Sequence, residues 1–235
     1  NDFAEDEYGN FYLGFWGGPG LTLFDREKEQ FAEELRDYFA APYESRLIND
    51  MLIDSKGNLW IASSSNGVSI FEPFTRNTTT FLPEYSNENS IPVVNINCLF
   101  EDQQGNIWIG SKGLSRYNWN TGDFTNYSVQ DGLSNDNVNS ILEDDDGRLW
   151  IGTEYGLSRF DPQKEVFKSF YEYDGIAGNW FGTGACRLQN GKMIFGGNKG
   201  ITVFHPDSIV DKMTLPPLYF KQLKIFDKDS LYDLS

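Results

Sequence analysis

The stretch "GRLWIGTEYGLSRF", residues 147–160, decides the fold because residues 105–117, "GNIWIGSKGLSRY", nearly repeat it. Three further copies align on the opening glycine of each stretch, at Gly9, Gly57 and Gly191, and successive copies lie 48, 48, 42 and 44 residues apart. Each copy has an aromatic or apolar residue three positions after that glycine and a second glycine before the next apolar run. A repeat of about 40–50 residues is typical of proteins built from stacked structural units.

Each unit predicts four short strands. An Asp lies three residues before the opening glycine in four units, where its carboxylate can accept turn N–H groups while the glycine takes a positive φ. Four-stranded units of this length predict an all-β fold, a β-propeller of about five antiparallel blades, with Trp60, Trp108 and Trp150 wedged between blades. The expected units are residues 1–46, 47–92, 93–135, 136–178 and 179–212.

The composition narrows the possible partners. The 235 residues carry a net charge of −16, and 16% of them are aromatic. A surface this acidic repels nucleic acid and anionic lipid, so we expect no nucleic-acid partner, and direct membrane docking is disfavoured. The sequence shows no apolar run of membrane-spanning length and no signal peptide, and we expect the chain to be a processed product or a piece of a longer one.

The propeller geometry divides the loops between two faces, because successive strands of a blade run in opposite directions. The hairpin between the second and third strands shares one face with the blade-to-blade connection. Residues at this face differ from unit to unit, whereas the Trp and glycine positions recur. The candidate ligand-binding residues on this variable face are Trp16, Asn97, Lys112, Asn139, Tyr155 and Trp180. Aromatic faces and amide or ammonium groups are suited to the C–H faces and hydroxyls of sugars.

The units resemble the two-component regulator propeller repeat. The resemblance depends on the motif [DE]-x-x-G-x-[LI]-W-I-G-[ST] followed by G-L-S-R-[FY], and it covers residues 1–209. It implies the extracytoplasmic, periplasmic sensor region of an inner-membrane hybrid two-component protein, in which a histidine kinase and a response regulator share one chain. It also implies recognition of an oligosaccharide, signalling across the membrane, and a homodimer of the full-length protein.

The same resemblance implies a longer chain. The five units would be the last blades of a larger propeller whose remainder, with the rest of the sensor chain, is a partner of this segment. Residues 213–235, which include "PPLYFKQLKIFDK" at 216–228, would begin an immunoglobulin-like β-sandwich of the Y_Y_Y type.

The sequence contains few candidate catalytic residues or metal ligands. The one histidine, His205, lies at a strand end where other units carry Asp, Glu or Asn, and we expect no catalytic role for it. The acidic run at residues 143–147 could attract calcium, but it lacks the alternating ligand spacing, so we expect no metal and no cofactor. Two alternatives to the sensor stay open: a propeller enzyme, lyase or hydrolase, acting on polysaccharide, and a non-catalytic protein-interaction propeller.

Overall fold

The computed structural model describes residues 2–15, 21–26, 28–32 and 47–209. They form five antiparallel sheets, in which four sheets have four strands and the last has three described strands. Trp16 and the expected sandwich segment at 213–235 lie outside the described residues. The elements are β1 (Asp2–Glu5), β2 (Phe11–Gly14), β3 (Leu21–Asp25), β4 (Gln30–Ala32), β5 (Ile48–Ile53), β6 (Leu59–Ser63), β7 (Val68–Glu72), β8 (Asn77–Phe81), β9 (Cys98–Glu101), β10 (Ile107–Ser111), β11 (Gly113–Asn118), β12 (Asp123–Tyr127), η3 (Val129–Asp131), β13 (Val138–Glu143), β14 (Leu149–Thr153), β15 (Gly156–Asp161), β16 (Val166–Phe170), η4 (Glu172–Asp174), β17 (Phe181–Arg187), β18 (Met193–Gly197), β19 (Gly200–Phe204) and η5 (Pro206–Ser208).

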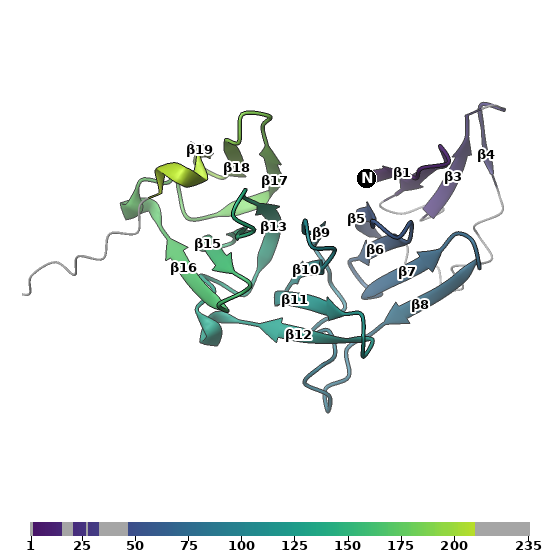
Figure 1. The fold of residues 1–235 in the computed structure, drawn as a ribbon, viewed down its shortest axis with the longest axis horizontal. Coiled ribbons are helices and arrows are strands. Elements are labelled where there is room, and N and C mark those ends of the chain that lie inside the picture. Colours follow the sequence, from purple (N-terminus) through teal and green to yellow (C-terminus); the bar gives the residue numbers. More distant parts are fainter. Residues whose placement is uncertain (1, 16–20, 27, 33–46, 210–235) are drawn as a thin grey trace, which may run out of the picture.

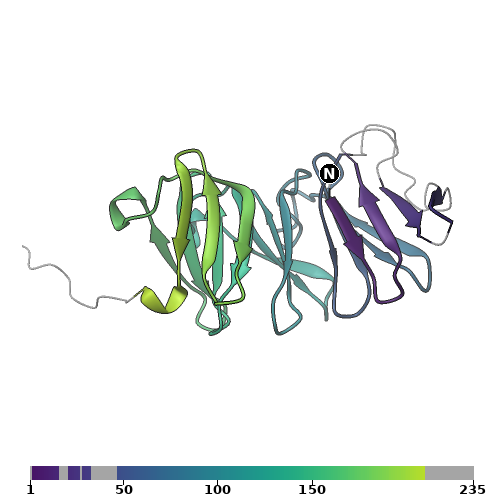
Figure 2. The same cartoon turned by 90° about the horizontal axis from the view of Figure 1, so that it is seen from above.

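The five sheets stand side by side as the blades of a propeller. The first strand of each blade packs on the first strand of the next, in the order β1, β5, β9, β13, β17. These strands lie on the inner side of an arc that is open between β1 and β17 (Figure 1). Seen from above, the first and last blades lie at opposite ends of the row (Figure 2). The predicted all-β propeller is therefore confirmed, in the form of an open arc of blades.

The Asp turn and the buried Trp form one unit. In the second blade, Asp54 Oδ1 accepts the N–H groups of Lys56 and Asn58 at 2.9 and 2.8 Å, and its Oδ2 accepts Trp60 Nε1 at 2.8 Å. The turn glycine, Gly57, has φ +82°. The third and fourth blades repeat the bond from Trp to Asp, and the three Trp side chains are at most 1% exposed. The Trp residues therefore belong to the core, as predicted.

The last blade has neither the turn Asp nor the buried Trp. Leu188 takes the place of the Asp and Ile194 that of the Trp. The two substitutions occur together because a buried indole N–H needs an acceptor and the carboxylate needs a donor. The turn still closes through its backbone, since Gly191 N donates to Leu188 O at 2.9 Å.

Two sets of hydrogen bonds join successive blades. On the variable face, the amide nitrogens of Asn49, Asn97 and Asn139 donate to backbone carbonyls of the following blade at 2.7, 2.9 and 2.8 Å. We call this set the asparagine ladder. On the opposite face, the carboxylates of Glu101 and Glu143 accept backbone N–H groups from the Asp turn of the preceding blade. The contact of the second and third blades and that of the third and fourth are therefore held at both edges around an apolar centre.

Candidate functional site

The hairpins and connections share one face, as the strand directions predicted. The second glycine of a blade donates its N–H to the connection that follows the blade: Gly67 to Val94 O at 2.9 Å, and Gly156 to Asn179 O at 2.7 Å. A side chain at Gly67 would place Cβ 2.1 Å from Phe81 O, and its φ is +66°. This close approach requires glycine and fixes the connection beside the hairpin turn.

An aromatic cluster lies on this face of the fourth blade. The ring of Tyr155, in the β14–β15 turn, lies 5.7 Å from that of Tyr171, and Tyr171 lies 5.5 Å from Tyr173 in η4. Tyr155 and Tyr173 are 56% and 83% exposed. Loss of hydration and then the Asp174 carboxylate raise the pKa of Tyr173, so its hydroxyl remains a donor at neutral pH. Three neighbouring phenol rings thus present apolar faces and hydroxyl groups to solvent.

Polar residues extend the cluster toward the third blade. Lys112 forms a backbone bridge with Asn137, and Asn137 Nδ2 donates to Glu154 Oε2 at 2.8 Å, next to Tyr155. The side chains of Lys112, Asn137 and Glu154 are exposed. We define the rim patch as Lys112, Asn137, Glu154, Tyr155, Tyr171 and Tyr173. It combines stacking surfaces with an ammonium, an amide and a carboxylate, a set of groups suited to a polyhydroxylated ligand.

The other predicted site residues lie in different surroundings. Asn97 and Asn139 are in contact, with Asn97 Nδ2 3.2 Å from Asn139 Oδ1, but both amides belong to the asparagine ladder. Trp180 precedes β17 and is 40% exposed, with its ring against the backbone of Gly182. Among the described side chains, no ring contact joins Trp180 to Tyr155. The structure thus links Lys112 through Asn137 to Glu154, the neighbour of Tyr155, and places Asn97, Asn139 and Trp180 at the inner strands.

Sequence reasoning assigned the connection of residues 171–180 to this face but did not single out Tyr171 and Tyr173. Comparison of this connection with the one after the third blade would have identified both tyrosines. The connection after the third blade has Ser128 and Gln130 where the later one has the two tyrosines, and both connections form a short 3₁₀ turn, η3 or η4, that ends at a glycine with positive φ. The fold therefore tolerates polar residues at both positions.

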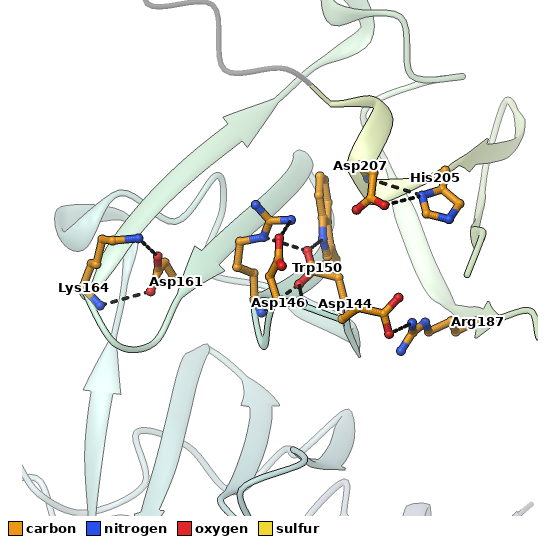
Figure 3. A network of polar contacts seen from close by, with 10 residues as sticks. Asp144, Asp146, Trp150, Asp161, Lys164, Arg187, His205 and Asp207 are labelled. Atoms are coloured by element: carbon orange, nitrogen blue, oxygen red, sulfur yellow. Dashed lines mark hydrogen bonds and ion pairs between the residues drawn. The ribbon is translucent and has the colours of Figure 1, made fainter. Parts of the chain in front are cut away.

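The carboxylates considered for calcium are engaged by other groups (Figure 3). Asp144 binds Trp150 and Arg148, Asp146 pairs with Arg148 at 2.7 Å, and Asp145 pairs with Arg187 at 2.5 Å. Within the described ranges, no group of three or more His, Cys, Asp or Glu side chains is arranged to hold a metal. His205 Nδ1 lies 3.7 Å from Asp207 and accepts its backbone N–H. That histidine caps η5.

The family model of the two component regulator propeller matches residues 42–65, 90–113 and 132–155. The chain carries two-component regulator propeller repeats. The three matches begin at regular intervals and each contains the connection into a blade and part of its first hairpin, so the sequence resemblance is confirmed. No curated protein matches the chain.

Solved structures share the fold. The extracellular domain attributed to the hybrid two-component system BT3049 from B. thetaiotaomicron superposes with a TM-score of 0.79 at 21% identity, over 98% of this chain and 31% of that one. PorZ, a surface component of the type-IX secretion system of Porphyromonas gingivalis, has a TM-score of 0.66 at 17% identity, over 87% of this chain and 32% of its own. The chain thus spans about a third of the length of these two proteins.

Propellers of this shape also include enzymes. A catalytically inactive variant of virginiamycin B lyase from Staphylococcus aureus has a TM-score of 0.66 at 12% identity, covering 86% of this chain and 64% of that one. At such identities the likeness concerns the fold. In the part of the chain that the structure describes, no helix is long and apolar enough to cross a membrane.

Proposed function

We propose that this chain is the ligand-binding propeller segment of an extracytoplasmic sensor in a hybrid two-component system. The repeats and the two-component propellers of the same fold support that assignment. In the full-length protein, a periplasmic homodimer anchored in the inner membrane would pass the signal to a cytoplasmic histidine kinase. The segment itself is non-catalytic in this proposal.

The ligand that we propose is an oligosaccharide bound at the rim patch. The observation that carries this proposal is the ring cluster of Tyr155, Tyr171 and Tyr173, in which Tyr155 and Tyr173 are exposed. Large exposed aromatic side chains in contact are costly to leave in water, and the connection after the third blade shows that the fold does not need them. Glu154, next to Tyr155 in the β14–β15 turn, and Lys112, bridged to Asn137, add exposed groups that can bond to sugar hydroxyls. Trp180, with Asn97 and Asn139 behind it, would contact the end of a longer ligand.

Calorimetry with short neutral and acidic oligosaccharides tests this proposal. We expect at least one class to bind without being cleaved. Tyr155→Ala and Tyr173→Ala should each weaken that binding by about two- to tenfold, the effect of losing one stacking contact. The matched control is Tyr8→Ala, since Tyr8 is 63% exposed and lies in an Asp turn on the opposite face.

Three outcomes would overturn the proposal. Chromatography of the mixture that showed new products would favour the polysaccharide lyase or hydrolase. Binding that Tyr8→Ala lowers as much as Tyr155→Ala would place the ligand elsewhere. A chain that binds no member of the panel would favour the protein-interaction propeller.

A further inference from the structure

The rim patch lies on an acidic part of the variable face. From the hairpin turn of the third blade to that of the last, the hairpins and connections of this face carry five carboxylates and two ammonium groups: Asp131, Asp136, Glu154, Glu172 and Asp174, with Lys112 and Lys199. The excess has the same sign as the net charge of −16 of the whole chain. A ligand that approaches the three phenol rings therefore meets a negative surface.

Three of the carboxylates are neighbours of the rings along the chain. Glu154 precedes Tyr155 in the β14–β15 turn, and Glu172 and Asp174 flank Tyr173 in η4. Loss of hydration is the larger cause of the raised pKa of Tyr173, and the negative charge of Asp174 is the next. The phenol groups of the patch therefore lie in the electric field of carboxylates.

The connection after the third blade brings two more carboxylates to this face. A Cβ added at Gly156 would lie 2.9 Å from both Ser134 Cβ and Tyr171 Cε1, so this connection and the Tyr171 ring meet at the hairpin of the fourth blade. Asp131 and Asp136 belong to the same connection, where each accepts a backbone N–H group, at 2.8 and 2.9 Å. Backbone hydrogen bonds fix both carboxylates in place without cancelling their charge.

The two ammonium groups offset only part of this charge. Lys199 Nζ binds both carboxylate oxygens of Glu172, at 2.9 and 2.7 Å, so these two side chains neutralise each other. Lys112 is bridged to Asn137, whose Nδ2 donates to Glu154 Oε2 at 2.8 Å. Since Lys112 can compensate one further carboxylate at most, the net charge of this face is negative.

Comparison of the two 3₁₀ turns separates the carboxylates that the fold uses from those that it does not. Asp131 and Asp174 occupy equivalent positions, and each accepts the backbone N–H at the start of its turn, at 2.8 and 2.9 Å. At the position of Glu172 the earlier turn has Val129. The hairpin of the third blade is one residue shorter than that of the fourth, which contains Glu154. Glu154 and Glu172 are therefore the carboxylates that can be replaced without removing a cap.

We propose, on the basis of the function proposed above, that the rim patch selects neutral oligosaccharides over those with uronic acid, sulfate or phosphate groups, and that Glu154 and Glu172 contribute to this selection. Carboxylate oxygens accept hydrogen bonds from hydroxyl groups, which a neutral sugar offers at most of its carbons. An anionic group on the sugar meets like charge at the same place, and like charges brought together across an interface weaken binding.

Calorimetry of the whole chain at low salt tests the selection with cellotriose, xylotriose and mannotriose as neutral probes and trigalacturonate as the acidic probe. We expect at least one neutral probe to bind and trigalacturonate to bind at least about tenfold more weakly. A neutral probe that binds is then compared with two derivatives of itself. The aldonate carries a carboxylate at the oxidised reducing end, and the alditol is reduced there and uncharged. The aldonate should bind about two- to tenfold more weakly, and raised salt should narrow this difference.

The double variant Glu154→Gln/Glu172→Gln removes two charges and keeps an oxygen acceptor at each position. It should bind the alditol within about twofold of the natural chain, which also shows that it is folded, and should narrow the gap between aldonate and alditol. The matched control is Glu84→Gln/Glu88→Gln, because both glutamates are exposed in the connection before the third blade and the net charge changes equally. This control should keep the gap of the natural chain.

The outcomes separate a failure of this selection from a failure of the proposed function. If trigalacturonate binds and no neutral probe does, or if aldonate and alditol bind equally well, the selection is wrong while sugar binding stands. If the double variant keeps the full gap, or if the control narrows it equally, Glu154 and Glu172 have no special part in the selection. A chain that binds none of the probes overturns both the selection and the sugar site.

Discussion

The same blade face is buried inside the molecule and exposed at its end. Leu157, opposite Gly152, is 1% exposed, whereas Ile201, at the same register position of the last blade, is 64% exposed. The first blade shows the converse, with Phe3 62% exposed and its equivalent Leu99 8% exposed. The repeat thus produces both halves of a blade contact in every unit, and a neighbouring blade decides whether they are buried.

The polar interactions at the edge of a blade also differ between the middle and the end of the arc. Glu101 and Glu143 bind the Asp turn of the preceding blade, whereas Glu5, at the equivalent position of the first blade, pairs with Arg26 of its own blade at 2.7 Å. A residue that joins blades in the middle of the arc forms a surface ion pair at its end. Identical sequence positions therefore contribute differently to stability, and substitutions can measure the difference.

The largest expected effect is at the Trp position. Trp108→Ala should lower the free energy of unfolding by about 3–5 kcal/mol, because it empties a fully buried site and leaves Asp102 without a donor. Ile194→Ala, at the equivalent position of the last blade, should cost clearly less, since Ile194 is only partly buried. Urea denaturation checks both. Equal losses would contradict the distinction between inner and terminal blades.

The second-largest effect concerns the apolar part of a blade contact, where the side chain that is removed makes no hydrogen bond. Leu157→Ala should cost about 2–5 kcal/mol, the range for a buried leucine. Ile201→Ala should stay within about 0.5 kcal/mol, as for an exposed residue. Measuring the urea midpoints of both variants beside the natural chain tests this. A large loss for Ile201→Ala would show that its side chain is covered in solution.

The contact between the first two blades contains a buried carboxylate, Asp50, at a position where the later blades have neutral residues. Burial and then the neighbouring Asp2 carboxylate raise the pKa of Asp50 to about 7, although its carboxylate accepts the Leu99 N–H at 2.7 Å. The later blades have Cys98 and Ser140 at this position. The folded chain then retains a proton that the unfolded chain releases, so stability should fall as the pH rises between the two pKa values.

Asp50→Asn removes this titration and keeps an oxygen that can accept the same N–H. Urea denaturation between about pH 5 and pH 8 should give a slope of at most about 1.4 kcal/mol per pH unit for the natural chain from this group. The variant should show a flatter dependence. If both proteins lose stability in parallel, Asp50 is not the group responsible.

The smallest effect concerns the asparagine ladder. Asn97→Ala should cost about 1 kcal/mol, because it removes the hydrogen bond to Val138 O at the partly buried edge of the contact. Asn120→Ala is the control, since Asn120 is exposed in the β11–β12 turn, away from the ladder. Thermal unfolding compares the two variants. If Asn97→Ala leaves the Tm unchanged, the ladder does not stabilise the blade contact.

The sequence by itself determined the blade. The bonds from Asp54 to its turn and to Trp60 join residues at most six positions apart, and the turn glycines act on their own backbone. Interactions this local follow from residue type and spacing, so the repeat, its strands and its turns could be predicted. The division of the loops between two faces also followed, because it needs only the alternating directions of the strands.

Only the tertiary structure decided what the variable residues contact. Asn97 and Asn139 share their position with Asn49, but their use in a ladder depends on a carbonyl some 42 residues away in the next blade. The ring contact of Tyr155 with Tyr171 likewise joins a hairpin turn to a separate connection. Such contacts depend on how blades and connections are packed together. Spacing along the chain does not determine that packing. The sequence could therefore place these residues on a face of the propeller but could not assign their partners.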